Sequence, residues 1–184
     1  MTGATAQHLS VAAGPGGADG AHRLILEQFV TGVAVLTCGD AQDVEGVTVS
    51  TLTLASRRPP MVSVALRRGS RGLQALLTTR TFVVNALGAR QADLARHFAR
   101  RHRARGVGQL AGEAWSDRTE DGVPVLVDAV GWLTCRVRGT VEVGDHELVL
   151  AQVERAVRGA GAPLLNYAGG LHGLAEATLH TERD

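Results

Sequence analysis

A run of hydroxyl side chains over residues 46–56, Gly-Val-Thr-Val-Ser-Thr-Leu-Thr-Leu-Ala-Ser, changes sides halfway along a predicted strand. Val47 and Val49 share one face at a period of two, but Thr51 and Thr53 then occupy the face that was apolar. A bulge or bend between Val49 and Thr51 would explain the inversion. Hydroxyls on both sides of such a bend suit the edge of a flat heteroaromatic ligand. Threonine is also a favoured strand residue, so an ordinary half-exposed sheet is the alternative.

A second candidate is an anion site within residues 67–76, Arg-Arg-Gly-Ser-Arg-Gly-Leu-Gln-Ala-Leu. Ser70 stands where an N-cap belongs, ahead of a helix whose free N–H groups and positive dipole end attract anions. Arg67, Arg68 and Arg71 surround it, and together these groups would hold a phosphate. Alternatively, Ser70 only caps the helix and the arginines are solvated.

A third candidate is His146, which follows the Gly144-Asp145 turn. Its near-neutral pKa permits a proton-transfer or hydrogen-bonding role, although a lone histidine at a turn is usually a surface residue. His97 and His102 are too far apart in sequence for an i, i+4 ligand pair, so no metal site is predicted.

The elements that must position these residues are mainly strands. The patterns predict a short helix near residue 24, a hairpin over residues 33–56, a strand after Pro59-Pro60, a helix within 69–80, a strand at 81–87, a helix within 89–102 and two long strands around residues 143–146. About six strands and three helices, with local connections and no repeated βαβ unit, predict a mainly β protein with flanking helices, built as a closed or partly closed antiparallel barrel.

The composition bounds the domain organisation and the partners. With 184 residues, 45% of them hydrophobic, we expect a disordered N-terminal arm at 1–20, one domain at 21–175 and a C-terminal tail at 176–184. A formal net charge of only +1 recruits neither nucleic acid nor an anionic membrane. No apolar run approaches the about 20 residues of a membrane helix, and no signal peptide is evident, so a cytoplasmic protein with reduced Cys38 and Cys135 is expected.

The order of these pieces resembles the flavin reductase-like proteins with an FMN-binding split barrel, the reductase components of two-component flavin monooxygenases. The matching stretches are residues 29–37, 46–60, 64–76, 81–87, 94–99, Trp115, 122–137, the turn at 144–146 and 162–174. The resemblance implies a six-stranded antiparallel split barrel that forms a homodimer, with flavin at the subunit interface.

The resemblance also implies an activity and a set of site residues. The activity is an NAD(P)H:flavin oxidoreductase that passes reduced FMN or FAD to a partner monooxygenase, with hydride moving from nicotinamide C4 of NADH or NADPH to flavin N5. His146 is implied near the nicotinamide, in the catalytic role. The implied cofactor-binding residues are Thr48, Val49, Ser50 and Thr51 for the isoalloxazine, Ser70 and Arg71 for the phosphate, and Asn85 and Leu171.

Four positions depart from the family pattern. Leu52 replaces a common phenylalanine, Gly72 a hydroxyl residue, Asn166 a common tyrosine and Leu171 a usual aromatic residue. Fewer aromatic and phosphate contacts predict that flavin behaves as a dissociable substrate. They also motivate the alternative hypothesis, a divergent protein that binds another planar ligand without reducing flavin.

Overall fold

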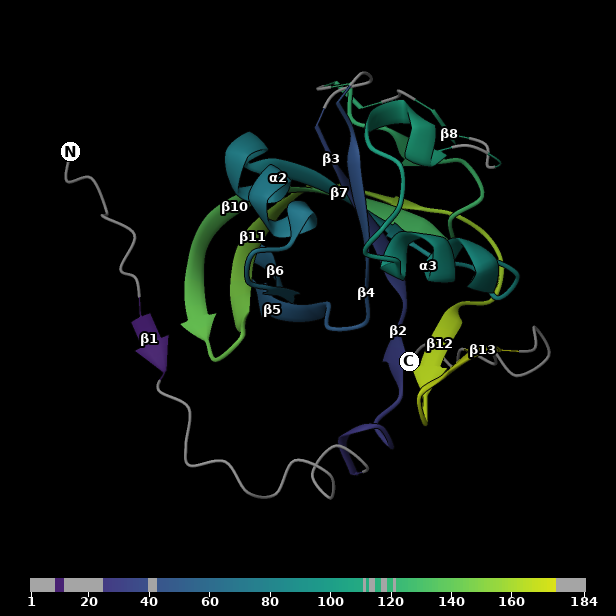
Figure 1. The fold of residues 1–184 in the computed structure, drawn as a ribbon, viewed down its shortest axis with the longest axis horizontal. Coiled ribbons are helices and arrows are strands. Elements are labelled where there is room, and N and C mark those ends of the chain that lie inside the picture. The colour runs from purple at the N-terminus through teal and green to yellow at the C-terminus, as the bar shows by residue number, and fades with distance from the viewer. Residues whose placement is uncertain are drawn as a thin grey trace.

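The computed structural model describes residues 9–11, 25–39, 43–110, 112, 115–116, 119–120 and 122–174. Its main sheet has eight strands, seven of them in the order β4-β3-β7-β10-β11-β6-β5, with β1 paired to β10 in parallel (Figure 1). The strands are β1 (Leu9–Val11), β3 (Ala34–Cys38), β4 (Glu45–Val49), β5 (Thr53–Arg57), β6 (Pro60–Arg67), β7 (Thr81–Ala86), β10 (Gly131–Val143) and β11 (His146–Arg158). The architecture is mainly β with few helices, as expected.

Two smaller sheets and three helical segments complete the described fold. One small sheet has the order β13-β12-β2, and the other pairs β8 with β9. Their bounds are β2 (Thr31–Gly32), β8 (Trp115–Ser116), β9 (Val125–Leu126), β12 (Leu164–Tyr167) and β13 (Gly170–Gly173). The helices are α2 (Arg71–Thr79), α3 (Ala92–Ala99) and a 3-10 helix (Gly106–Leu110).

The main sheet curls round because its two ends are joined by three residues. Strands β4 and β5 stand at opposite ends of the path, and residues 50–52 connect them (Figure 1). In this link, the Thr51 hydroxyl donates to the Ala65 carbonyl on β6 at 2.9 Å and accepts from the Ala65 N–H at 3.2 Å. In the pairing of β5 with β6, Thr53 lies opposite Ser63, so Thr51 lies opposite Ala65. The Thr51 hydroxyl therefore replaces the backbone groups with which the Ala65 N–H and carbonyl would otherwise pair.

This link corrects the predicted hairpin over residues 33–56. Its first half is confirmed, because Ala34–Cys38 pairs antiparallel with Glu45–Val49. Its second strand is in fact two, β4 and β5, which belong to different ends of the sheet. The hydroxyls therefore change sides where the chain leaves one strand for another, and the strand count exceeds the predicted six.

Both amphipathic helices lie where their periodicity placed them. Ser70 caps α2, and its Oγ accepts a hydrogen bond from the Leu73 N–H at 3.3 Å. The helix ends at Arg80, whose left-handed conformation (φ 61°) lets its N–H donate to the Leu76 carbonyl. Helix α3 is shorter than the predicted 89–102, because Arg100 is already extended.

The described core has three apolar clusters, of which the smallest contains Val83, Val123 and Val125. The first fills the curled sheet, where Leu73 and Leu76 of α2 pack against side chains such as Phe82 and Val64. The second lies beneath α3 and is centred on Phe98, which is fully buried. Burial of side chains this large is the main source of stability, at about 25 cal/mol per Å² of apolar surface.

Several predicted features fall at or beyond the edge of the described residues. Of the helix expected near residue 24, residues 25–29 show one turn, in which Gln28 N–H donates to the Ile25 carbonyl at 3.0 Å. The arm at 1–20, apart from residues 9–11, and the tail at 176–184 lie outside the described part of the chain. Within that part, no helix is both long and apolar enough to cross a membrane.

Candidate functional site

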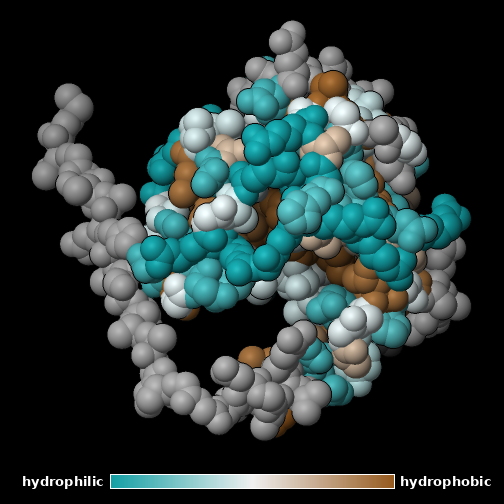
Figure 2. All heavy atoms as spheres, in the orientation of Figure 1, coloured by the Kyte–Doolittle hydropathy of each residue, from teal (hydrophilic) through white to brown (hydrophobic). Residues whose placement is uncertain are grey.

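A groove of about 520 Å³ lies between the start of α2, the end of α3 and strand β4. Six of its thirteen lining residues are arginines, and none is acidic. Figure 2 shows hydrophilic side chains gathered over this region between α2 and α3. The lining residues are Val47, Thr48, Arg67, Arg68, Gly69, Ser70, Arg71, Gly72, Phe98, Ala99, Arg100, Arg101 and Arg103. Such a concentration of positive charge favours an anionic ligand.

A buried carboxylate behind the groove orients two of the arginines. Glu45 accepts a hydrogen bond from Arg103, whose guanidinium also donates to the Gly46 carbonyl, and both side chains are about nine-tenths buried. Arg71 Nη2 lies 3.5 Å from the same Glu45 oxygen. Burial lowers the pKa of Arg103, and the neighbouring Glu45 carboxylate opposes that shift.

Other charged groups of the groove remain available. Among the described residues, Arg67 and Arg100 make no ion pair, whereas Arg68 is paired with Glu142. Arg71 Nη2 is buried and, despite its distance to Glu45, makes no hydrogen bond with the described residues. It is therefore a donor held in place without an acceptor.

These groups fit a phosphate. The N-terminus of α2 supplies unpaired backbone N–H groups, Ser70 supplies a hydroxyl, and Arg71 supplies the unsatisfied guanidinium donor. Hydrogen bonds between a guanidinium and an anionic oxygen are about twice as strong as neutral ones. The structure thus brings Ser70 and Arg71 together with Thr48 on one surface.

The four residues of the segment 48–51 have different environments. Thr48 lines the groove, with its hydroxyl donating to the Ala95 carbonyl of α3 at 2.7 Å. Val49 is in the first core cluster, so only its backbone can face a ligand. Ser50 is half-buried, and Thr51 is exposed but bonded to Ala65.

His146 stands beside the loop that carries Ser70. Its Nδ1 lies 2.7 Å from Asp145 Oδ1, and the hydrogen bond lowers the pKa of the Asp145 carboxyl. His146 also pairs with Arg67 across β11 and β6, and Arg68 N–H donates to the Asp145 carbonyl at 3.0 Å. The turn is therefore fixed against one rim of the groove.

Asn85, which the family resemblance implies in cofactor binding, lies inside the protein. Its side chain is fully buried, Nδ2 donates to the Val35 carbonyl at 3.0 Å and to Thr37 Oγ1 at 3.2 Å, and Oδ1 accepts from Leu126 N–H at 2.8 Å. Both of its N–H donors are used inside the protein, where the side chain joins β7, β3 and β9. A cofactor-binding role for Asn85 stays a prediction.

The positions that depart from the family pattern are also explained by packing. Leu52 packs against the first core cluster, and Leu171, on β13, packs against the second, beside Phe98. Leu171 does not line the groove, although Phe98 does. Asn166 pairs with Leu171 on β12, and the neighbouring Tyr167 is 40% exposed.

The sequence interpretation missed the arginines that follow α3. No role was assigned from the sequence to Arg100, Arg101 and Arg103, yet all three line the groove. The signal that could have found Arg103 is Glu45, the one charged residue of β4, because a buried carboxylate needs a partner.

The sequence profile of the flavin reductase like domain matches residues 26–175. The chain belongs to this family. Its relatives include the NADPH-flavin oxidoreductase of Streptomyces viridifaciens, 37% identical over 151 residues that cover 82% of this chain and 78% of that protein. The reductase component of a 4-nitrophenol monooxygenase from Rhodococcus opacus is 35% identical over 147 residues, covering 80% and 76%.

Solved structures give the same family assignment. The NADH:FAD oxidoreductase of Streptomyces globisporus C-1027, in complex with NAD and FAD fragments, superposes with a TM-score of 0.80 at 30% identity, covering 90% of this chain and 99% of that one. The two Streptomyces relatives are named as oxidoreductases, and the Rhodococcus relative as a reductase component. They support the reductase hypothesis and lend nothing to the alternative of a non-reducing binding protein.

Proposed function

We propose that this chain transfers a hydride from NADH or NADPH to FMN or FAD and releases the reduced flavin to a separate monooxygenase. The observation that carries the proposal is the arginine-lined groove at the N-terminus of α2, in a chain of the flavin reductase family. The monooxygenase partner follows from relatives that are named as reductase components of such systems. A cytoplasmic location, expected from the sequence, remains part of the proposal.

The chain's own residues bind and orient the reactants. Ser70, Arg71 and the first N–H groups of α2 would hold the flavin phosphate, and the segment Thr48–Thr51 would border the ring system. When bound, flavin supplies an acceptor for a hydride. The protein contributes distance and orientation, which make a bimolecular reaction effectively unimolecular.

His146 is proposed to orient the nicotinamide. Asp145 Oδ1 lies 2.7 Å from Nδ1 of the imidazole. A neutral ring with its proton on Nδ1 therefore donates a hydrogen bond to this carboxylate, and Nε2 is left to accept a hydrogen bond from the nicotinamide. No proton transfer is required of it, because the transferred group is a hydride.

We further propose a split-barrel homodimer. The curled sheet joined through residues 50–52 accounts for the barrel. Five exposed hydrophobic side chains mark a surface that a second subunit would bury: Ile25 (64% exposed), Leu26 (67%), Phe29 (64%), Val30 (58%) and Tyr167 (40%). Sedimentation of the purified chain at micromolar concentration tests the dimer, and a monomer would contradict it.

The activity is tested by mixing the protein with NADH or NADPH and FMN under anaerobic conditions. We expect loss of the visible absorbance of flavin together with oxidation of the nicotinamide. The absence of flavin-dependent oxidation with either nucleotide, and with either FMN or FAD, would refute the proposal.

The phosphate site is tested with Arg71→Gln. The variant should raise the KM for FMN about tenfold or more, yet leave the KM for riboflavin, which has no phosphate, unchanged. Arg96→Gln is a matched control, because Arg96 is an exposed arginine of α3 that pairs only with Asp93 among the described residues and does not line the groove. Equal effects of Arg71→Gln on FMN and riboflavin would place the phosphate elsewhere.

A further inference from the structure

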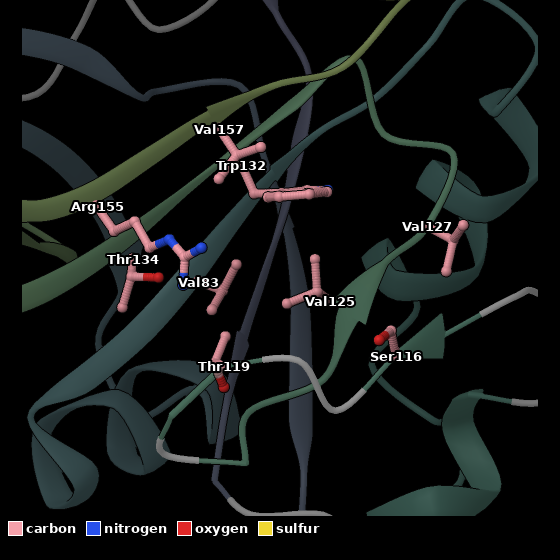
Figure 3. Close-up of a pocket in the computed structure, with 9 residues that line it drawn as sticks. All are labelled: Val83, Ser116, Thr119, Val125, Val127, Trp132, Thr134, Arg155 and Val157. Carbon is pink, nitrogen blue, oxygen red and sulfur yellow. The ribbon is translucent and has the colours of Figure 1, made fainter.

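A second, smaller cavity lies on another part of the main sheet. It has a volume of about 250 Å³ and is formed by β7, β10 and β11 on one side and the chain around β8 and β9 on the other (Figure 3). Four of its nine lining residues are valines, among them Val83, Val125 and Val157. It shares no lining residue with the arginine-lined groove, so it is a separate site.

One wall of this cavity is a rigid aromatic surface. The Trp132 indole N–H donates to the Leu126 carbonyl at 3.0 Å, which fixes the ring. Trp132 also packs against Val83, Val123 and Val125. A fixed indole among valines favours a flat apolar group, since aromatic rings gain affinity from offset or edge contacts beyond area burial.

One end of the cavity is polar and positively charged. Thr134 and Arg155 are direct cross-strand partners on β10 and β11, and both line the cavity. Figure 3 shows the Thr134 hydroxyl and the Arg155 guanidinium directed toward the space beside Val83. Neither side chain has a hydrogen-bond partner among the described residues.

The carboxylate next to Arg155 on β11, that of Glu154, is paired with another arginine. The pairing shifts between Thr134 and Cys135, which leaves Glu154 as the extra residue. Glu154 is held by Arg136, whose Nε lies 2.6 Å from its Oε1. The nearest carboxylate along the strand is therefore already paired, and Arg155 retains its positive charge for another anion.

From these observations we propose that the cavity binds a small aromatic carboxylate. The apolar walls and the Trp132 ring receive the ring of the ligand, while Arg155 and Thr134 donate hydrogen bonds to its carboxylate. Sites for drug-sized ligands have volumes of about 300–1,000 Å³, so this smaller cavity suits a single ring and not the three fused rings of a flavin. The site is independent of the proposed reductase activity.

Benzoate is the probe for this site. In ¹⁵N–¹H spectra of the full chain we expect benzoate to shift the Trp132 indole resonance, with a Kd on the order of 1 mM, and to leave the Ser70 amide of the groove unshifted. Benzamide, which has the same shape without the charge, should bind about tenfold more weakly. A benzoate-induced shift of the Ser70 amide without a shift of the Trp132 indole would overturn the proposal. The absence of a Trp132 shift at saturating benzoate would also overturn it, even if the cause is a second copy of the chain that covers this face.

Two variants and a control distinguish the loss of the ligand's polar contacts from a loss of folding. Arg155→Gln should weaken benzoate binding about tenfold and leave benzamide binding unchanged, and Thr134→Val should weaken benzoate several-fold. Arg158→Gln is the control, because Arg158 is exposed on the same strand but does not line the cavity. Wild-type affinity for benzoate in both Arg155→Gln and Thr134→Val would refute the site.

Discussion

Gly72 leaves no room for the hydroxyl residue that the family resemblance implies at this position. It is the second residue of α2 and is buried against β4. A Cβ added there would lie 2.8 Å from Val47 Cγ1 and 2.9 Å from Val47 Cβ, closer than real Cβ contacts allow. The space of the missing side chain is therefore already occupied by Val47.

We predict that Gly72→Ala destabilises the protein by about 1 kcal/mol. Overpacking of this kind costs about 1–3 kcal/mol, and replacing glycine by alanine in a helix returns up to about 1 kcal/mol. Val47→Ala alone should cost about 1–2 kcal/mol, because two partly buried methyl groups are lost. In the double variant, Val47→Ala removes Val47 Cγ1, the atom closest to the added Cβ, so α2 and β4 can adjust to each other.

The decisive measurement is a double-mutant cycle by urea unfolding. The double variant should be more stable than the sum of the single changes by about 1 kcal/mol. Gly139→Ala is the control, since nothing lies within 4 Å of the Cβ it would add, and it should change stability by less than about 0.5 kcal/mol. Effects of Gly72→Ala and Val47→Ala that add within about 0.5 kcal/mol would refute the argument from steric contact.

Three further predictions concern charged and nucleophilic groups. Glu45→Gln should lower the free energy of unfolding by about 3 kcal/mol in urea titrations, because it leaves a buried guanidinium without its counter-ion; a loss below about 1 kcal/mol would contradict this. Burial raises the pKa of both thiols, Cys38 and Cys135, to about 12, so neither should release thionitrobenzoate from Ellman's reagent at pH 8 until urea unfolds the chain. The Asp145 carboxyl should titrate by NMR below its ordinary 3.8 and move back toward that value in His146→Ala. Since its folded pKa is the lower one, the stabilisation is complete above about pH 4 and disappears as the pH falls through that folded value.

Periodicity predicted the regular elements well because local residues determine them. The long strands on either side of Gly144-Asp145 and the capped helix at Ser70 form where apolar spacing and cap chemistry placed them. The phase inversion near Thr51 correctly located a bend. The inversion did not indicate that the two halves of the stretch belong to opposite ends of the sheet. The position of β5 depends on its pairing with β6, and β6 is far from β4 along the strand order.

Only some of the residues that line the groove could be predicted from the sequence. Ser70 and Arg71 carry a local signal, a cap followed by a cation. Arg103 carries none, since its position depends on Glu45, which lies 58 residues earlier in the chain. The hydrogen bonds of Asn85 were not predictable for the same reason, because they join three strands and no pattern within one strand reveals them.

The three-residue link between β4 and β5 also bears on how the chain folds. Because these neighbours in sequence occupy the two ends of the sheet path, the ring of strands can close only after β3, β7, β10, β11 and β6 have found one another. Such distant pairings form slowly, whereas the hairpin of β10 and β11 is local. The surface that joins Thr48 to Ser70 would then be completed last, so a ligand bound there should slow unfolding and leave the refolding rate unchanged.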